Sequence, residues 1–380
     1  MGEFITGIQQ AGIGVINAEE AKHLFKDLFG MNVLIFEDKA PASLMTCYTG
    51  SQVHHRHALL ALNMAGGGGF EIWQYTSRTP SVPLVKPQLG DLGIFAIKIK
   101  CRDVAAAHRY FTGYPGVKIS ALMRTPDERP HFWLKDIYGN HFNMVEGDDW
   151  FKYSNGICGG VSGAVIGVSN MKKALPFYRK ILGIDEVIYS GIAPMMDVPP
   201  EHESGQLYHR VLLKKPVSGY GAFSKLLGSV QIELIEAKEW APEKIYADRY
   251  WGDCGFIHLC FDILNMDGLK DHAVKAGYPF SVDSNDSFTM GSSAGRFCYI
   301  EDPDGTLIEL VETHKVPILK KAGWYLDLKK RKVNKPLPNW MINLMALNKI
   351  GAKSKSMPVS ESTVKNGKVS LLKKRSVVER

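Results

Sequence analysis

Four short segments of the chain alternate polar and apolar residues and carry a polar side chain at an equivalent place. These are Glu71 in FEIWQ, Asn143 in HFNMV, Glu233 in QIELI and Glu309 in LIELV. This alternation is typical of a β-strand that packs one face on a core and leaves the other free to line a cavity. A further strand-like run, GFIHLCFD, contains His258. Carboxylates and an imidazole can bind a divalent cation or transfer protons, so these residues are candidates for a site.

The segments recur because the sequence is internally duplicated. AGIGVINAEEAKHLFKDLFGM, from Ala11, matches AVIGVSNMKKALPFYRKILGI, which begins 153 residues later at Ala164. FWLKDIYGNHFNMVEG, from Phe132, likewise parallels CYIEDPDGTLIELVET, which begins 166 residues later at Cys298. Each quarter predicts a strand, a helix and three further strands, with Asp-x-x-Gly turns before the last strand of the second and fourth quarters. We therefore expect an α+β fold of four βαβββ modules in tandem.

This tandem pattern resembles the vicinal oxygen chelate superfamily (glyoxalase, bleomycin resistance protein and extradiol dioxygenase), and within it the two-domain glyoxalase I-like proteins. The resemblance covers residues 7–312 and is most specific in DPDGTLIELVE and GFIHLCFD. It implies two cupped, mixed β-sheet domains with helices outside. We expect a first glyoxalase-like domain over residues 1–150 and a second over residues 155–314, each with two modules.

The resemblance also implies up to two metal ligands per module, one on the first strand and one on the last. The first-strand positions are Gln10, Ala96, Gly163 and His258, and the last-strand positions are Glu71, Asn143, Glu233 and Glu309. If neighbouring modules pair, neither site is complete. If the first module pairs with the fourth, one site collects Gln10, Glu71, His258 and Glu309, and the other is nearly empty of ligands. We favour the second pairing, in which Glu233 is structural. Because Gln9 adjoins Gln10, a register slip of one residue would turn the wrong glutamine toward the site.

That quartet is similar to the ligand set of glutathione-dependent glyoxalase I. It implies one divalent ion per chain (Zn, Ni, Co, Fe or Mn), with Glu309 as the base and Glu71 as a second proton carrier. The implied reaction is lactoylglutathione lyase-like, in which an isomerase or lyase moves a proton next to a carbonyl through a metal-bound enediolate. The expected partner is therefore a small-molecule carbonyl substrate. Two positions that hold glutathione-binding Arg residues in that family are here Gly14 and Cys254, and only Arg296 remains as a candidate cation.

Two alternatives stay open at this point. A metal-free, small-molecule-sequestering protein would line its cavity with aromatic side chains such as Trp73 and Tyr75. An extradiol-type dioxygenase would need two His ligands and one Glu, and Gly163 removes one of those His residues. The run of His54, His55 and His57 indicates only strand residues near a cavity rim. The glycines at 66–69 indicate a hairpin loop, since no helix with phosphate-binding spacing follows them.

Charge is distributed unevenly along the chain. The net charge is +7, but residues 315–380 hold 17 Lys and Arg against 3 Asp and Glu, which leaves −7 for residues 1–314. A nucleic-acid-binding domain would carry basic residues on its fold, so we expect no nucleic-acid partner. The pattern predicts a helical extension over residues 315–352 and a disordered basic tail over 353–380. The extension either packs across the domains or makes weak contact with a membrane surface.

Composition bounds the remaining properties. The six cysteines form no CxxC pair, which favours free thiols in a reducing compartment. The sequence contains no apolar run near the ~20 residues that a membrane-spanning helix needs. The N-terminal residues do not have the pattern of a signal peptide. We therefore expect a cytoplasmic monomer.

Overall fold

The computed structural model describes residues 4–286, 288–331 and 335–351, and these contain the four expected modules. The first module comprises β1 (Ile5–Gly14), α1 (Ala18–Phe29), β2 (Val33–Pro41), the 3-10 helix η1 (Ser43–Tyr48), β3 (His55–Leu62) and β4 (Gly69–Tyr75). The second comprises β5 (Gly93–Cys101), α2 (Val104–Thr112), β6 (Lys118–Ile119), β7 (Met123–Arg124), β8 (Pro130–Lys135) and β9 (His141–Glu146).

The second half of the chain repeats this order. The third module comprises β10 (Cys158–Gly167), α3 (Met171–Pro176), the π-helical turn η2 (Phe177–Ile181), β11 (Glu186–Pro194), β12 (Leu207–Lys215), α4 (Ser224–Leu227) and β13 (Val230–Ala237). The fourth comprises β14 (Gly255–Ile263), α5 (Met266–Lys275), β15 (Val282–Asp283), β16 (Phe288–Met290), β17 (Ser293–Glu301) and β18 (Leu307–Leu319).

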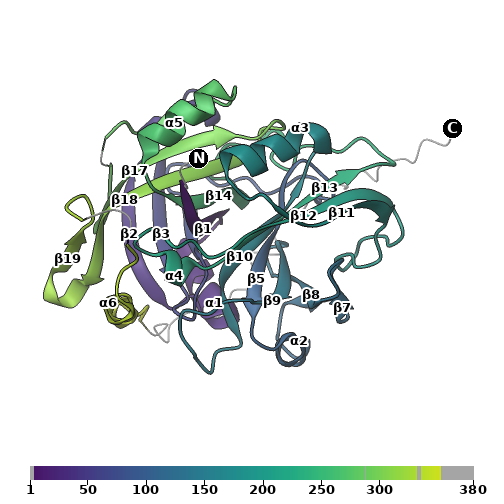
Figure 1. The fold of residues 1–380 in the computed structure, drawn as a ribbon, viewed down its shortest axis with the longest axis horizontal. Helices are drawn as coiled ribbons and strands as arrows, with labels where there is room; N and C mark the ends of the chain where they lie inside the picture. The colour runs from purple at the N-terminus through teal and green to yellow at the C-terminus, as the bar shows by residue number, and fades with distance from the viewer. Residues whose placement is uncertain (1–3, 287, 332–334, 352–380) are drawn as a thin grey trace.

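The strands form two curled sheets that lie side by side (Figure 1). One has the order β15-β17-β18-β14-β1-β4-β3-β2, and the other β11-β12-β13-β10-β5-β9-β8-β6. We call them the 1+4 sheet and the 2+3 sheet after the modules that build them. The favoured pairing of the first module with the fourth is therefore confirmed, because β1 runs antiparallel to β14. The sequence halves 1–150 and 155–314 are units of the duplication, and each sheet takes one module from each half.

The same local chemistry starts the helix of every module. Asn17, Asp103, Asn170 and Asn265 are the N-cap residues, and the side chain of each accepts a hydrogen bond from a backbone N–H in the first turn. Asn265 differs from the others because it has a positive φ of 60°. That left-handed cap is the reason why the turn of the fourth module is hard to recognise from sequence.

The helices and the convex faces of the sheets share one apolar core. The ring of Phe29 on α1 lies 4.7 Å from the ring of Phe142 on β9, so the first and second modules pack together although their strands belong to different sheets. The predicted hairpin loop at residues 66–69 lies between β3 and β4. Gly68 exchanges two backbone hydrogen bonds of 2.8 Å with Val161 of β10. A Cβ on Gly67, where φ is +107°, would lie 2.7 Å from the carbonyl carbon of Gly160. The glycines therefore allow a loop of the 1+4 sheet to approach the 2+3 sheet closely.

The extension after residue 314 differs in part from the helix that the sequence predicts. β18 continues to Leu319, passes through the short 3-10 helix η3 (Lys320–Ala322), and pairs with β19 (Trp324–Asp327). Gly323, with a φ of 65°, supplies the turn, and the alternating residues Val316 and Ile318 are buried. Besides η3, the described part of the extension is helical in α6 (Asn339–Leu344) and the 3-10 helix η4 (Met345–Leu347), which pack across the sheet through the buried Ile342 and Met345. The predicted disordered tail at 353–380 lies outside the described residues.

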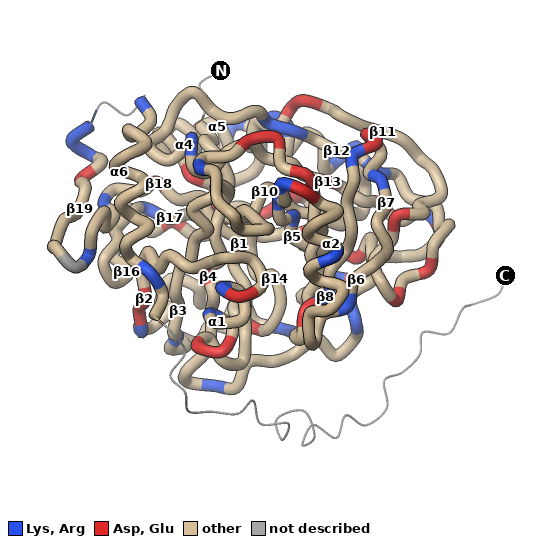
Figure 2. Tube along the Cα trace, turned by 90° about the horizontal axis from the view of Figure 1, so that it is seen from below, with Lys and Arg blue, Asp and Glu red and all other residues tan. Residues whose placement is uncertain are grey.

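Charged residues are also distributed unevenly in space. Figure 2 shows Lys and Arg residues along the chain around β19, whereas β1 carries no charged residue over its whole length. Within the described residues, none of the helices has the length and apolar character required to cross a membrane.

Candidate metal centre

The four predicted ligands lie on four adjacent strands of the 1+4 sheet, in the order β18, β14, β1 and β4. Glu309 belongs to β18, His258 to β14, Gln10 to β1 and Glu71 to β4. The register aligns them, because Gly12 of β1 pairs with both Glu71 and His258, and Cys260 pairs with Glu309. Period-two alternation then turns all four side chains to the concave face of the sheet.

The polar ends of these side chains converge. Nε2 of His258 lies 3.3 Å from Oε2 of Glu71 and 3.1 Å from Oε2 of Glu309. Nε2 of Gln10 lies 3.3 Å from each of the same two oxygens. Ligand atoms of Glu71, His258 and Glu309 all fall within 4.8 Å of one another, and all three residues are buried. Four residues that are far apart in the sequence therefore form one compact group of donor atoms.

A bulge in β1 resolves the choice between Gln9 and Gln10. The register with β14 shifts between Ile8 and Gln10, which leaves Gln9 as the extra residue. Gln9 donates a 3.0 Å hydrogen bond to Oγ1 of Thr313, whereas Gln10 contacts the two glutamates. Gln10 is therefore the member of the site, and Gln9 lies beside it on the same concave side.

Gly12 makes room for the imidazole of His258. A Cβ at this position would stand 2.3 Å from Cε1 and 2.5 Å from Nε2 of the ring. No real Cβ can approach so closely, so the ring can lie over β1 only because residue 12 has no side chain. Sequence reasoning did not identify this residue, and a small residue two positions after the ligand Gln10 was the only available signal.

Tyr299 of β17 was also not predicted. Its hydroxyl lies 3.2 Å from Nδ1 of His258. If Nδ1 carries the proton and donates it to this oxygen, the lone pair of Nε2 points toward the carboxylates, which is the tautomer that a metal ligand requires. Burial, together with the charges of Glu309 and Glu71, raises the pKa of Tyr299 well above its ordinary value, so the hydroxyl stays neutral.

The donor atoms fit a divalent cation. Oε1 of Gln10 is buried without a hydrogen-bond partner among the described residues, and Nε2 of His258 has the carboxylate oxygens of Glu71 and Glu309 beside it. A buried polar atom without a partner is costly unless a ligand satisfies it. One imidazole, one amide and two carboxylates suit Zn, Ni, Co, Fe or Mn better than a thiolate-loving ion. A half turn of the Gln10 amide would present its oxygen to the centre.

The carboxylates also set the charge of the imidazole in the metal-free protein. Burial lowers the pKa of His258, but the charge of Glu309 and contacts with Glu309 and Glu71 raise it to about 9. Burial raises the pKa of Glu309, and the charge of His258 more than offsets this and holds it below its ordinary value. A proton on the imidazole therefore compensates the two carboxylates when no cation does.

Comparisons with known proteins agree with this geometry. Residues 160–310, which include the third module and most of the fourth, match the model of the Glyoxalase/Bleomycin resistance protein/Dioxygenase superfamily. This segment of the chain is therefore similar to the vicinal oxygen chelate superfamily. No curated protein sequence matches the chain significantly.

Solved structures extend the comparison to the whole fold. A Bacillus subtilis protein described as a "putative dioxygenase" is 12% identical, with a TM-score of 0.52, and covers 82% of this chain and 86% of that chain. Glyoxalase I from Zea mays is 14% identical, with a TM-score of 0.48, and covers 80% of this chain and 92% of that chain. At this identity the Bacillus structure supports the fold alone.

The cup of the 2+3 sheet is filled by an ion-pair network. Nζ of Lys98 lies 2.5 Å from Oε2 of Glu233, and Nε of Arg210 lies 2.5 Å from Oε1. Asn143 bonds to His131 at 2.8 Å. The Lys98 side chain crosses Gly163 with its Cδ 3.2 Å from where a Cβ would be. Of the four aligned positions, Ala96 and Gly163 offer no ligand atom, and the ammonium of Lys98 compensates Glu233 in place of a metal ion. Glu233 is thus structural, as predicted.

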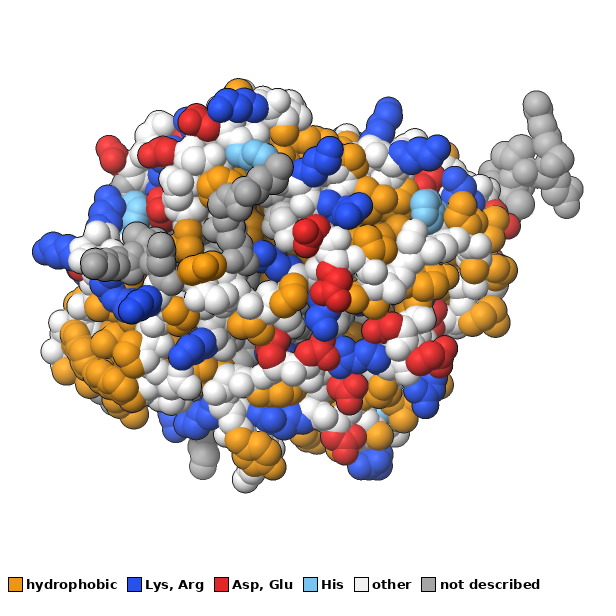
Figure 3. Space-filling model, in the orientation of Figure 1, with side chains coloured by type: hydrophobic (Ala, Val, Ile, Leu, Met, Phe, Trp, Pro, Cys, Tyr) orange, Lys and Arg blue, Asp and Glu red, His pale blue; other side chains and the backbone are white. Residues whose placement is uncertain are grey.

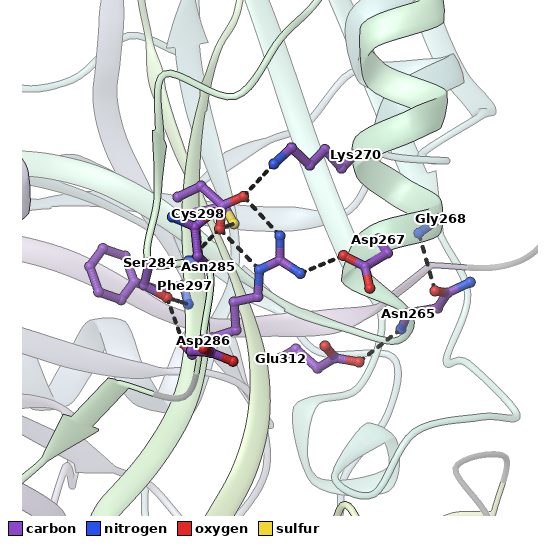
Figure 4. A network of polar contacts seen from close by, with 12 residues as sticks. Asn265, Asp267, Gly268, Lys270, Ser284, Asn285, Asp286, Phe297, Cys298 and Glu312 are labelled. Carbon is purple, nitrogen blue, oxygen red and sulfur yellow. Dashed lines mark hydrogen bonds and ion pairs between the residues drawn. The ribbon is translucent and has the colours of Figure 1, made fainter.

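The expected glutathione-binding cations are absent or engaged. A Cβ on Gly14 would stand 1.9 Å from the carbonyl oxygen of Asp253, so no side chain fits there. Arg296 donates to both oxygens of Asp283 at 3.0 and 2.8 Å and to Asp267 at 2.6 Å. Figure 4 shows this network, which also includes Lys270, between α5 and the strands β15 and β17. The guanidinium holds structure together and is not free for a substrate carboxylate.

A second group of potential ligands, Glu19, Glu37 and His57, has simpler partners. Lys22 lies 2.6 Å from Glu19, and His57 lies 2.8 Å from Glu37. Both glutamates are solvent-exposed. These contacts make the group a set of polar pairs around the buried His57.

Proposed function

We propose that the 1+4 sheet carries a metal-dependent isomerase or lyase that moves a proton next to a carbonyl group. The observation that carries this proposal is the buried convergence of Gln10, Glu71, His258 and Glu309, in which the amide oxygen of Gln10 has no hydrogen-bond partner among the described residues. A divalent ion held there supplies Lewis acidity, which stabilises negative charge that develops on the oxygens of a carbonyl substrate.

Two carboxylates are placed to handle the proton. Glu71 and Glu309 border the same two adjoining cavities, so a molecule in the cup can touch both. A glutamate is ionised at neutral pH, as a base requires. We assign Glu309 as the group that removes the proton and Glu71, in its protonated form, as the group that protonates the neighbouring carbon; exchange with solvent then deprotonates Glu309 and reprotonates Glu71.

The neighbouring strands orient these groups. Gln10 lies between the two carboxylates, 3.3 Å from each, and fixes their separation. The hydroxyl of Tyr299 contacts Nδ1 of His258 and so orients the imidazole.

The alternatives have less support. A sequestering protein without metal does not require two buried carboxylates, an imidazole and an amide to converge at the centre of its cup. An extradiol-type dioxygenase uses two His and one carboxylate, and among the described residues the centre has His258 as its single imidazole.

The test uses NMR to monitor exchange of a substrate α-proton with solvent deuterium. The protein is reconstituted in turn with Zn, Ni, Co, Fe and Mn. A screen would include glutathione hemithioacetals and free α-hydroxyketones such as acetoin. We expect metal-dependent exchange, and a loss of about 10²- to 10⁴-fold in Glu309→Gln, the usual contribution of a general base.

Glu233→Gln is the matched control, because it makes the same change at the equivalent position of the 2+3 sheet and should leave exchange unchanged. Metal-loaded protein that binds these compounds without exchange, or Glu309→Gln with the parent rate, would contradict the proposal.

A further inference from the structure

The cavity beside the centre is almost entirely apolar. We call it the apolar cavity; it has a volume of about 100 Å³ and adjoins an aromatic cavity of about 270 Å³ lined by Trp73, Trp251 and Tyr299. Apart from Glu71 and Glu309, none of the described residues that line the apolar cavity is ionisable. Its other polar side chains are Gln9, Gln10, Ser293 and Thr313. The only negative charges at this cavity are thus those of the centre itself.

The apolar walls come from segments outside the strands that hold the ligands. Phe223, Leu226 and Leu227 belong to α4 and the turn before it, in the third module. A Cβ on Gly7 of β1 would stand 2.6 Å from Cβ of Leu227, so α4 packs directly on β1. In the first module the corresponding β3–β4 loop, residues 63–68, is the short glycine-containing turn. The longer β12–β13 loop therefore covers the cup of the other sheet.

The C-terminal extension adds another wall. Val316 of β18 and Met345 of η4 both line the apolar cavity. Met345 is held there by backbone hydrogen bonds of η4 and by its burial against the sheet. The extension therefore completes the binding cavity as well as covering the sheet.

Two of the cations around the cup are already paired. Arg56, at the aromatic cavity, lies 3.0 Å from Asp38 and also donates to the carbonyl oxygen of Asp38. Arg296 is held by Asp283 and Asp267. A substrate carboxylate or phosphate in the apolar cavity would be buried beside two glutamates without a counter-charge, which is strongly unfavourable.

From these walls and charges we propose that the substrate is an uncharged α-hydroxycarbonyl compound whose apolar chain or ring fills the apolar cavity. The proposal rests on the function proposed above for the same centre, and it excludes anionic conjugates such as those of glutathione. The oxygens of the substrate face Glu71 and Glu309, and its apolar chain or ring lies against α4 and the C-terminal extension.

The first test compares three probes that share one head group. Acetoin, 3-hydroxyoctan-2-one and 6-hydroxy-7-oxooctanoate differ only in tail length and in a terminal carboxylate. Calorimetry would be done on metal-stripped full-length protein, so that binding does not depend on whether an ion is held. Each buried methylene adds about fourfold to affinity. We expect the eight-carbon neutral ketone to bind at least about tenfold more tightly than acetoin and than the carboxylate.

A charge placed in the wall provides a second test. Ser293 lines the apolar cavity, and its hydroxyl is buried without a hydrogen-bond partner among the described residues. Ser293→Lys should improve binding of 6-hydroxy-7-oxooctanoate at least about tenfold, as expected when a buried charge gains a partner. The matched control, Ser190→Lys, makes the same change at an exposed site on β11 and should leave all three affinities unchanged.

The outcomes separate this proposal from the previous one. Equal binding of the neutral and the carboxylate probe, or no gain from the longer tail, would overturn the substrate class even if the metal-loaded protein exchanges protons with acetoin. Tail-dependent binding without any exchange would support the cavity and overturn the proposed reaction.

Discussion

At the scale of single residues, Gly12 decides where the His258 ring can lie, although it provides no ligand. Its missing Cβ leaves the space that the imidazole occupies, as the 2.3 Å approach to Cε1 shows. We predict that Gly12→Ala displaces the ring and lowers bound divalent metal at least about tenfold, the usual effect of disturbing the groups that orient a ligand. Mass spectrometry of the purified variant and parent proteins measures the amount of bound divalent metal in each.

The control for that variant is Gly113→Ala. Gly113 follows α2, has an ordinary negative φ, and a Cβ there would meet nothing within 4 Å. It should retain full metal content and stability. Gly12→Ala protein that keeps its metal would show that the site tolerates movement of His258, and the assignment of Gly12 would be wrong.

Glu233 and Glu309 occupy equivalent strand positions but have opposite surroundings. Glu233 compensates two buried cations, so we predict that Glu233→Gln lowers the free energy of unfolding by about 3–5 kcal/mol, as expected when a buried ion pair loses one partner. Metal content should not change. Denaturant unfolding measures the free energy of unfolding, and metal analysis of the same preparation measures the metal content. Glu309→Gln should show the reverse pattern, with a lower metal content and a smaller change in the free energy of unfolding.

The pH dependence of that difference follows from the pKa of Glu233. Burial raises this pKa, but Arg210 and Lys98 lower it to about 2, below the ordinary value of about 4.3 for the unfolded chain. The ion pair therefore stabilises the protein fully at pH values above the pKa of this glutamate in the unfolded chain. The stabilisation is lost as the pH falls through the pKa of Glu233 in the folded protein. The stability gap between parent and Glu233→Gln should shrink between about pH 4.5 and pH 2. A gap that stays constant over this range would contradict the assigned ion pair.

Most of the centre could be predicted from single residues, because the duplication aligns Glu71 with Glu233 and Asn143 with Glu309. The alignment could not show Lys98, which lies two residues beyond the aligned Ala96 and fills the second cup from a neighbouring strand position. It also could not distinguish Gln9 from Gln10, since a bulge changes the face of every following residue.

At the scale of elements, the strands and helices that the repeat predicts are present, and the differences lie where tertiary contacts decide. The segment after residue 314 contains Leu, Lys and Trp residues that suit a helix, yet it begins as a strand because Val316 and Ile318 face the apolar side of the sheet. Gly323 then reverses the chain. The covering role of α4 was likewise not predictable, since a four-residue helix has no periodic signal of its own.

At the scale of the whole molecule, the duplication alone allowed two pairings of modules. The argument that a complete ligand set needs the first and fourth modules together selected the pairing that the structure has. The ligand set that the family resemblance implies thus predicted the topology, since the four residues of that set lie on adjacent strands. The shared core between Phe29 and Phe142 then holds the two sheets as one body.

One face of the molecule combines aromatic and basic residues. Trp324 and Trp340 are 38% and 58% exposed, and their rings lie 6.3 Å apart. Tyr325 adjoins them on β19, and Lys315 lies over its ring at 4.6 Å. Figure 3 shows hydrophobic side chains gathered over β19 and α6 at the lower left. Residues 315–351 contain nine Lys and Arg and one acidic residue. Exposed Trp and Tyr next to lysines are typical of surfaces that contact anionic lipid headgroups.

We predict that the full-length protein binds vesicles of phosphatidylserine and phosphatidylcholine and does not bind vesicles of phosphatidylcholine alone. Neutralising Lys329 and Lys330 to Gln should weaken sedimentation with the anionic vesicles at least about tenfold, because each lysine contributes about 1 kcal/mol near such a surface. Trp324→Ala together with Trp340→Ala should weaken binding at unchanged net charge.

Tyr153→Ala, which removes an aromatic ring that is 78% exposed on another part of the molecule, is the control and should bind like the parent. Equal binding to neutral vesicles, or tryptophan variants that bind as the parent does, would show that this face does not contact lipid. The expected result would place an apolar substrate cavity, one wall of which is the extension itself, next to the membrane in which apolar carbonyl compounds dissolve.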